Sequence, residues 1–441
     1  MGEFEQLLDE YTTKEEIDWS QMEKGETNQY DGLMDLHIHS KGSFDGMERV
    51  TKIIKMARNN GVKTIAITDH NTMSAIKDYF EDNGYDTNSV YADVDGVKVV
   101  AGTEITCKID VPNCKGNDLK LHLLVYGADM ENSPLARLLE IKAANDFAFD
   151  FGMPIHCLKK MGLITNAQQE LEWKKRLKEF IIEERKSRPG INEMTRELTS
   201  KFLEQQPINI AKSNRELCEM LADYNMVARL NLKVEDIIEC AHASGGICVL
   251  AHPAVNLVRA MPDNREKTIK ILLGMGIDGF EIMCNSSDPK YNDMIKSACN
   301  KYKGSKQDKK KILYTAGSDF HNTLNNKIGY VNYKDPIQRA SFRNILDAIE
   351  SLQLARVSES KNGKNFNSER IGRILKHYMD ENALCISGTV DAEIFQDMKE
   401  YKKQKKIANN RLGMASTQIK KGKKKKHPKM KDVCADDEYN M

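Results

Sequence analysis

The chain has 441 residues, enough for one large domain with an insertion or for two domains. Its composition, 40% hydrophobic and 30% charged, is that of an ordinary globular protein, and no stretch approaches the roughly 20 apolar residues that a membrane span needs. The acidic, polar N-terminus is unlike a secretory signal, and the ten cysteines are scattered without a CxxC pair. We therefore expect a cytoplasmic protein with reduced thiols and no membrane partner.

The formal net charge of +1 hides an asymmetry between the C-terminus and the rest of the chain. Residues 399–441 contain fourteen Lys and Arg against five Asp and Glu, a net of +9, so residues 1–398 carry −8. This basic tail includes the lysine-rich run 420–426 and has no sustained apolar face, which predicts disorder. Two roles stay open for it: contact with nucleic acid or another anionic surface, and the commoner role of a solubilising tail.

After an N-terminal extension of residues 1–31, the first part of the chain alternates apolar runs with amphipathic segments. Val50, Ile53, Ile54 and Ala57 share one face of a predicted helix, and Gly61 follows its end. The predicted elements are strand 33–38, helix 47–59, strand 62–67, helix 71–80, strand 97–105 and strand 119–126.

Between residues 131 and 240 the strand signals vanish and helix-forming sequence replaces them. In the segment 171–186, Trp173, Leu177 and Ile181 repeat every four residues among charged residues, and Arg188-Pro189-Gly190 breaks the run. We interpret this part as a mostly helical insertion that caps the site on the loop face of a barrel. The alternative is a separate domain that takes no part in the site.

The alternation of strands and helices resumes after the insertion. The predicted elements are strand 247–250, helix 265–275, strand 279–283, helix 290–302, strand 312–316 and helix 342–352. Repeated strand-then-helix units indicate an α/β fold with a parallel sheet, most simply a barrel. The predicted organisation is the extension 1–31, a first barrel part 32–130, the insertion 131–240, a second barrel part 241–398 and the basic tail 399–441.

Six of the ten histidines lie in short motifs in, at or just beyond the ends of these strands. The motifs are Asp35-Leu36-His37-Ile38-His39, Asp69-His70-Asn71, Gly102-Thr103-Glu104, Leu121-His122-Leu123, Ala251-His252-Pro253 and Asp319-Phe320-His321. Side chains at the carboxyl ends of barrel strands converge on one site. His37 and His39 are two residues apart and so point to the same side of a strand, and Asp35 shares that side and is expected to orient an imidazole.

Each motif alone has an ordinary explanation. Glu104 and Asp319 could form buried salt bridges or cap helices, His122 could be a hydrogen-bonded core residue, and His252 could belong to a turn. Taken together, nine imidazole and carboxylate groups are too many for one ion and fit two or three divalent ions. A ligand set without thiolate suits Mn, Zn or Fe at a hydrolytic site, where paired ions assist displacement at a phosphoester.

The ordered motif series resembles the polymerase-and-histidinol-phosphatase (PHP) family of metal-dependent phosphoesterases, over residues 33–126 and 245–321. The resemblance implies a distorted seven-stranded α/β barrel with a trinuclear metal centre. It implies that His37, His39, Glu104 and Asp319 hold the first ion, and that Glu104 bridges to a second ion held by His122 and His252. It implies that Asp45, His70 and His321 hold the third.

Asp45-Gly46 and the long helical insertion are similar to the branch of this family that acts on small nucleotides. That branch includes 3′,5′-nucleoside bisphosphate phosphatases and 5′-exonucleases of short RNA. Three features depart from its pattern: Asn71 where a second aspartate is usual, Lys41-Gly42 where small polar residues are common, and a longer, more charged insertion. These departures concern the substrate rather than the metal ligands.

We therefore expect a cytoplasmic hydrolase in which a metal-bridging hydroxide attacks the phosphomonoester of a small substrate, plausibly a nucleotide. The catalytic set is His37, His39, Asp45, His70, Glu104, Asp319 and His321, acting through the ions, and Arg188, Asn285 and Asn322 are candidates for binding the substrate. Three alternatives stay open. They are a 5′-exonuclease of short RNA or DNA assisted by the basic tail, a histidinol phosphatase, and a non-catalytic, metal-stabilised scaffold that binds nucleic acid.

Overall fold

The computed structural model describes residues 33–43, 45–110, 119–187, 196–205, 230–258, 264–284, 288–302, 312–324, 326–331, 335–336 and 368–386. All of these belong to the first of the two units into which the chain divides, Met1–Val390. The predicted N-terminal extension, the helix 342–352 and the basic tail lie outside the described residues. None of the described helices is long and apolar enough to cross a membrane.

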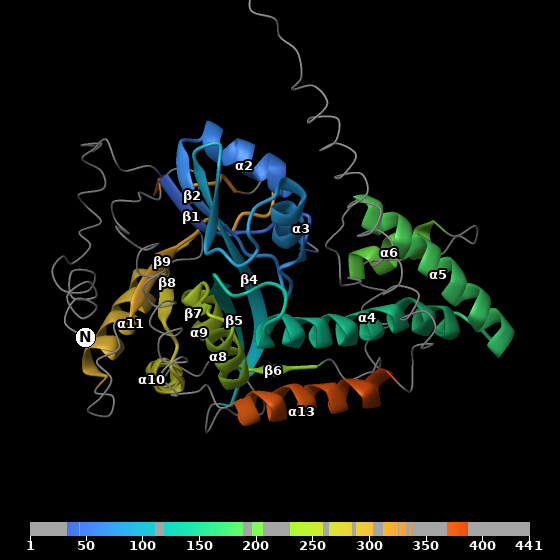
Figure 1. The fold of residues 1–441 in the computed structure, drawn as a ribbon. Helices are drawn as coiled ribbons and strands as arrows, with labels where there is room; N and C mark the ends of the chain where they lie inside the picture. The colour runs from blue at the N-terminus through green and yellow to red at the C-terminus, as the bar shows by residue number, and fades with distance from the viewer. Residues whose placement is uncertain are drawn as a thin grey trace, which may run out of the picture. The chain divides into compact units, whose positions relative to one another are not determined.

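A nine-stranded sheet forms the centre of this unit, and all seven predicted strands are present in it (Figure 1). In spatial order its main path is β1 (Leu33–Ile38), β2 (Val62–Ile67), β4 (Val97–Ile109), β5 (Leu119–Tyr126), β7 (Ile247–Leu250), β8 (Gly279–Met283) and β9 (Leu313–Ala316). Two short strands, β3 (Tyr91–Val94) and β6 (Leu232–Lys233), pair with β4 off this path. A separate two-stranded ribbon consists of β10 (Tyr330–Val331) and β11 (Asp335–Pro336).

The sheet is mixed, whereas the alternation of strands and helices predicted a parallel one. Strand β5 runs antiparallel to both of its neighbours, β4 and β7, and the other pairs on the main path are parallel. The reason lies in the connection between β4 and β5, which is only residues 110–118. A parallel pair needs a crossover of about a dozen residues or more, so this short link permits only an antiparallel neighbour.

The sheet is also not closed, so the predicted barrel is not confirmed. Strands β1 and β9 end the path, and among the described residues they are joined by an isolated parallel bridge between Ile38 and Phe320 instead of a ladder. The backbone N–H of His39 donates to the Phe320 carbonyl at 2.8 Å. Strand β9 has only four residues, so this contact falls beyond its end. The bridge brings the His37–His39 segment beside Asp319 and His321.

The helices predicted at 47–59, 71–80, 265–275 and 290–302 are present, two of them with late starts, as α2 (Val50–Asn59), α3 (Ser74–Asn83), α10 (Arg265–Met275) and α11 (Pro289–Lys301). Two further helices, α8 (Val234–Ala243) and α9 (Pro253–Val258), were not predicted. Helix α2 begins three residues later than predicted because Arg49, its N-cap, has an extended backbone with φ of −73° and ψ of 150°, and the Met47 N–H donates to the His321 carbonyl at 2.9 Å. Helix α3 begins late because Asn71 has a φ of 52° and its N–H donates to the Glu104 carbonyl. Both delays lie in loops that lead to the histidine motifs.

The region predicted as an insertion contains two long helices, α4 (Pro134–Lys160) and α5 (Ala167–Ser187), and the shorter α6 (Arg196–Glu204). It also contains the short strand β6 and most of α8, where the sequence predicted no strand. The buried rings of Phe180 and Phe202 lie 5.3 Å apart between α5 and α6. Helix α4 contacts α8 and the C-terminal helix α13 (Ser368–Ile386), and it buries an ion pair between Lys142 and Asp146. The boundaries of the insertion and its role as a cap stay predictions.

Two glycines offer a matched test of how tightly β8 and β9 pack. A Cβ added at Gly279 would lie 2.3 Å from the Leu313 carbonyl oxygen, whereas one at Gly274, in α10, would meet only the Tyr302 hydroxyl at 3.8 Å. We expect Gly279→Ala to lower the free energy of unfolding by about 1–3 kcal/mol through overpacking against backbone. Gly274→Ala should raise it by about 0.5–1 kcal/mol because alanine favours a helix interior. Urea unfolding of both variants measures the difference, and equal stability would contradict this packing.

Candidate metal centre

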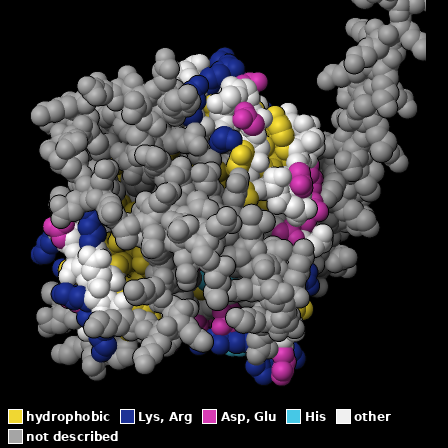
Figure 2. Space-filling view, turned by 60° about the vertical axis from the view of Figure 1, so that its left-hand side comes forward, with side chains coloured by type: hydrophobic (Ala, Val, Ile, Leu, Met, Phe, Trp, Pro, Cys, Tyr) yellow, Lys and Arg dark blue, Asp and Glu magenta, His cyan; other side chains and the backbone are white. Residues whose placement is uncertain are grey.

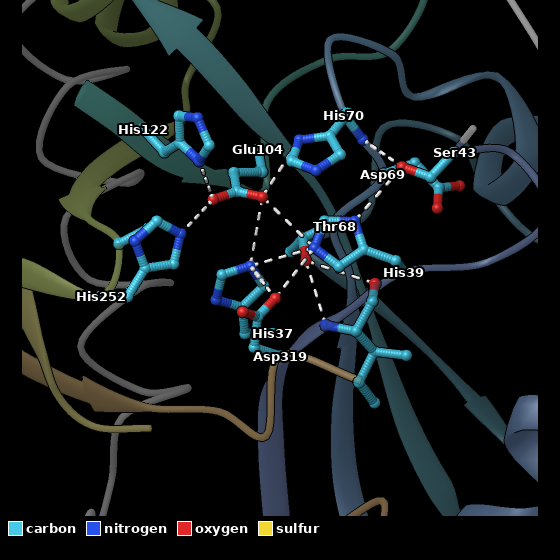
Figure 3. A network of polar contacts seen from close by, with 12 residues as sticks. His37, His39, Ser43, Thr68, Asp69, His70, Glu104, His122, His252 and Asp319 are labelled. Atoms are coloured by element: carbon cyan, nitrogen blue, oxygen red, sulfur yellow. Dashed lines mark hydrogen bonds and ion pairs between the residues drawn. The ribbon is translucent and has the colours of Figure 1, made fainter. Parts of the chain in front are cut away.

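The side chains predicted to bind metal come together at one edge of the sheet. Figure 3 labels all of them except Asp45 and His321. They come from several elements of the sheet. Three lie within strands: His37 near the end of β1, Glu104 in β4 and His122 in β5. The others lie in the loops that follow strands: His39 and Asp45 after β1, His70 after β2, His252 after β7, and Asp319 and His321 after β9. His122 reaches this edge from the first half of its strand because β5 runs antiparallel to β4. The Ala251 N–H donates to the His122 carbonyl at 3.0 Å, which sets His122 beside His252.

The carboxylate of Glu104 is the centre of the group. Glu104 is 1% exposed, and its two oxygens contact five imidazoles. Oxygen Oε1 lies 2.9 Å from His122 Nδ1 and 2.8 Å from His252 Nε2, and Oε2 lies 3.3, 3.2 and 3.2 Å from His37 Nε2, His39 Nε2 and His70 Nδ1. Figure 3 shows Glu104 between these rings, of which His37 and His39 come from the end of β1 and the other three from separate segments. One side chain thus links β4 to four other segments of the chain.

Asp45 and Asp319 are the carboxylates of the neighbouring part of the site. Asp45 Oδ2 lies 3.2 Å from Nε2 of both His70 and His321. Asp319 Oδ1 lies 3.4 Å from His37 Nε2 and 3.3 Å from His39 Nε2. With His39, the residues Asp45, His70 and His321 form a group whose ligand atoms all lie within 4.8 Å of one another.

One close contact and two buried atoms without a hydrogen-bond partner indicate that the residues fit divalent cations. His37 Nε2 faces His39 Nε2 at 3.2 Å, and two neutral imidazoles can share at most one proton between such nitrogens. Asp45 Oδ1 and His252 Nδ1 are buried and have no hydrogen-bond partner among the described residues. Coordination would remove the close approach of the two imidazole nitrogens, and the imidazole and carboxylate donors suit Mn, Zn or Fe.

The charges within the cluster reinforce one another. Burial alone would raise the pKa of Glu104, but the charges of His70 and His37 and hydrogen bonds from His122 and His252 hold that pKa well below its usual range. Burial alone would lower the pKa of His39, but hydrogen bonds with Asp319 and Glu104 raise it to about 10. The carboxylates are therefore ionised, and cations that bind here would displace protons from imidazoles.

Backbone strain is concentrated at the same edge. Asn71, His252 and Asp319 have φ angles of 52°, 25° and 52°, in the region that residues other than glycine rarely adopt. Each of the three follows a strand by a few residues. Such conformations persist where surrounding contacts enforce them, and they cluster at functional sites.

Asp35 has a different role from the one predicted for it. Its carboxylate does not orient an imidazole: Oδ1 accepts from the Ser318 N–H at 2.8 Å and Oδ2 accepts from the Gly329 N–H at 2.8 Å. The His37 N–H also lies 3.3 Å from Oδ1. Burial raises the pKa of Asp35 to about 6 although these amides oppose the shift. Asp35 therefore fixes the loop after β9 against β1.

Glu281, which the sequence analysis missed, orients His37 instead. It is buried in β8, its Oε1 lies 3.1 Å from His37 Nδ1, and its Oε2 accepts from the His252 N–H at 2.7 Å. An Nδ1–H that donates to Glu281 leaves the His37 Nε2 lone pair directed at Glu104 and Asp319. A lone carboxylate in the otherwise apolar run 279–283 was the available signal.

The predicted substrate residues are only partly described. Asn322 Oδ1 accepts from the Leu324 N–H at 2.9 Å, which closes the turn after His321. Arg188 and Asn285 lie outside the described residues.

Comparisons with known proteins agree with this site. Residues 35–228, somewhat less than half of the chain, match the family described as the PHP domain. An uncharacterized protein of Methanocaldococcus jannaschii is 37% identical over 81 residues, which are 16% of this chain, and the chain spans only 42% of that relative's length. The family match and the histidine–carboxylate cluster together support a metal-dependent hydrolase.

Two solved structures are similar at 18% identity and a TM-score of 0.47. One is a proposed metal-dependent phosphoesterase from Bifidobacterium adolescentis, matched over 71% of this chain and 95% of its own. The other is an amidohydrolase from Chromobacterium violaceum with bound sulfate and no metal, matched over 73% and 96%. Likeness at this level does not extend to function.

Glu281→Gln tests whether Glu281 orients the cluster. Glutamine keeps one oxygen for His37, but its NH₂ group cannot accept from the His252 N–H, and the negative charge is lost. We expect the affinity for Mn²⁺ to fall by about 10–100-fold while the fold is kept. Equilibrium dialysis with element analysis measures it, with Glu140→Gln at an exposed glutamate as the control. Unchanged Mn²⁺ affinity would show that Glu281 serves only the backbone.

Proposed function

We propose that this protein is a PHP-type phosphoesterase that hydrolyses the phosphomonoester of a small substrate, a nucleotide of the 3′,5′-bisphosphate type. The observation that carries the proposal is the buried Glu104 carboxylate shared by five imidazoles, with two further carboxylates beside them. A structural ion pair needs one partner for a carboxylate, whereas a shared carboxylate among many imidazoles is typical of a ligand that bridges ions.

The proposed ligands divide into three overlapping groups. His37, His39, Glu104 and Asp319 would hold one ion; Glu104, His122 and His252 a second; and Asp45, His70 and His321 a third. Three sets of nearby donors overlap with this division: His37, His39 and Glu104; His70, Glu104 and His122; and His39, Asp45, His70 and His321. Asp319 and His252 belong to none of these sets, and they join the division through their contacts with His37, His39 and Glu104. Bound ions of this type acidify water and neutralise charge on phosphoryl oxygens.

Exposure suggests the side from which a substrate approaches. The side chains of Asp45, His122, Asp319 and His321 are 25–28% exposed, whereas those of His37, His39 and Glu104 are at most 1% exposed. The buried residues exclude water and hold the geometry, and the exposed ones border the position of the phosphoryl group. We also propose that the helical insertion caps this side.

The described surface favours a small substrate over long nucleic acid. On the face drawn in Figure 2, basic and acidic side chains both appear among the described residues, so that part of the surface is not uniformly basic. Any contact of the basic tail with nucleic acid stays a prediction.

The six described cysteines are free, which agrees with the cytoplasmic, reducing compartment that we propose.

Activity assays test the proposal directly. Metal-depleted protein, reloaded with Mn²⁺, should release phosphate from p-nitrophenyl phosphate and fastest from a 3′,5′-nucleoside bisphosphate in a nucleotide panel. Histidinol phosphate and a short RNA belong in the same panel, because preferred release from either would select an alternative activity. Preferred cleavage of RNA, weakening steeply with salt, would indicate an exonuclease that engages several phosphates. Absence of metal-dependent release from every substrate would contradict a phosphoesterase.

Asp45→Ala tests the third group of ligands. Removal of this carboxylate takes away the contact that His70 and His321 share, so we expect one fewer Mn²⁺ bound per chain and loss of most phosphate release. The fold should stand because Asp45 lies in a loop. Asp93→Ala, at an exposed residue of β3, is the matched control. Unchanged Mn²⁺ stoichiometry in Asp45→Ala would remove Asp45 from the ligand set.

A further inference from the structure

A second cluster of metal-ligating side chains lies away from Glu104. It consists of His242 in α8, Cys248 in β7 and Asp278 directly before β8, whose ligand atoms lie within 4.8 Å of one another. Strands β7 and β8 are parallel; His252 of the first cluster follows the carboxyl end of β7, and Glu281 lies in the middle of β8. Cys248 and Asp278 therefore lie at the amino end of the same two strands, and helix α8, which carries His242, contacts β7 (Figure 1).

Asp278 organises this second cluster. Its Oδ2 lies 2.8 Å from His242 Nε2 and accepts from the Cys248 N–H at 2.8 Å. Asp278 is 1% exposed and Cys248 is fully buried, whereas the His242 side chain is 15% exposed. A buried carboxylate needs a compensating positive charge, and the His242 edge gives solvent access to the cluster.

The backbone holds the three residues in place before anything binds. The Asp278 N–H donates to the Cys248 carbonyl at 2.9 Å, and the Leu313 N–H donates to the Asp278 carbonyl at 2.8 Å. Helix α8 ends at Ala243, and Gly245, with a φ of 78°, allows the tight turn into β7. The donors are thus positioned by three adjacent strands and one helix end.

The donor types differ from those of the first cluster. The second cluster combines a thiol, an imidazole and a carboxylate, and a soft thiolate beside nitrogen and oxygen donors favours Zn²⁺. Three protein ligands leave one position of a tetrahedron, which water can take from the solvent-exposed side. Binding would release the Cys248 thiol proton to solvent.

We propose that His242, Cys248 and Asp278 form a second, separate metal site that binds one zinc-class ion. The ion would tie α8 to the amino ends of β7, whose other end leads to His252, and of β8, which carries Glu281 in its middle. The proposed ion would have three protein ligands and one position open to water. The site stands independently of the phosphoesterase function. A histidine–aspartate ion pair without a metal is the competing explanation.

Co²⁺ is the probe that separates the two clusters, because only a thiolate ligand gives the sulfur-to-cobalt charge-transfer band in the near ultraviolet. We expect this band in the full-length protein loaded with Co²⁺, its loss in Cys248→Ser, and its persistence in His39→Ala, which alters the first cluster. Cys157→Ser, at an equally buried cysteine in α4, is the matched control and should keep the band. A band that is absent from the unaltered protein or persists in Cys248→Ser would overturn the proposal.

His242→Asn supplies a second test at the exposed side of the cluster, where a substitution perturbs packing least. We expect weaker Co²⁺ binding at the charge-transfer band, and a zinc-dependent rise in the melting temperature of the His39→Ala protein that His39→Ala/His242→Asn lacks. Equal zinc stabilisation of the two proteins would favour the simple ion pair. Because both proteins carry the His39→Ala change, this result does not depend on hydrolytic activity.

Discussion

The arrangement of the site depends on one buried carboxylate, Glu104, in contact with five imidazoles. Burying an ionised carboxylate is costly unless opposite charge and hydrogen bonds compensate it, so these contacts must persist together. They couple β1, β2, β4, β5 and the residue after β7 through one side chain. The antiparallel course of β5 is part of this requirement, because it lets His122, early in its strand, reach the edge where His252 follows the end of β7. A parallel β5 would direct that histidine to the other end of the sheet.

The ligands can converge although the sheet is open, because β1 and the residues after β9 need to meet only where β1 ends. The bridge between Ile38 and Phe320 joins the two ends of the strand path where β1 ends, and Asp35 secures it by accepting from the Ser318 and Gly329 backbone. The absence of side chains at Gly317 permits this proximity, since a Cβ there would lie 2.2 Å from His37 Cβ. Gly317, two residues before Asp319, thus determines how closely the residues after β9 approach β1.

The local pattern of apolar and polar residues was enough to predict the strands and the residues near their ends. The apolar runs identified every strand on the main path, and the positions of histidines relative to strand ends identified residues that do converge. The direction of β5, the open sheet, the partner of Asp35 and the orientation of His37 by Glu281 depend on contacts between residues far apart in the chain. Glu281 and His37 are 244 positions apart, and no periodicity in either segment links them. Positive φ at His252 and Asp319 is likewise imposed by neighbours, because neither residue type requires it.

The two ends of β7 and β8 differ in how well their polar groups are hydrogen-bonded. At the carboxyl end, His252 has a strained backbone and a buried Nδ1 without a hydrogen-bond partner among the described residues, features that a sheet would avoid if packing alone mattered. At the amino end, Asp278 accepts from the Cys248 backbone and pairs with His242, so the same strands begin in a well-satisfied polar cluster. Strain at one end persists only when the surrounding structure over-determines it. Asp278 thus ties α8 to the amino ends of β7 and β8, opposite the end at which β7 leads to His252 and the contacts of Glu104.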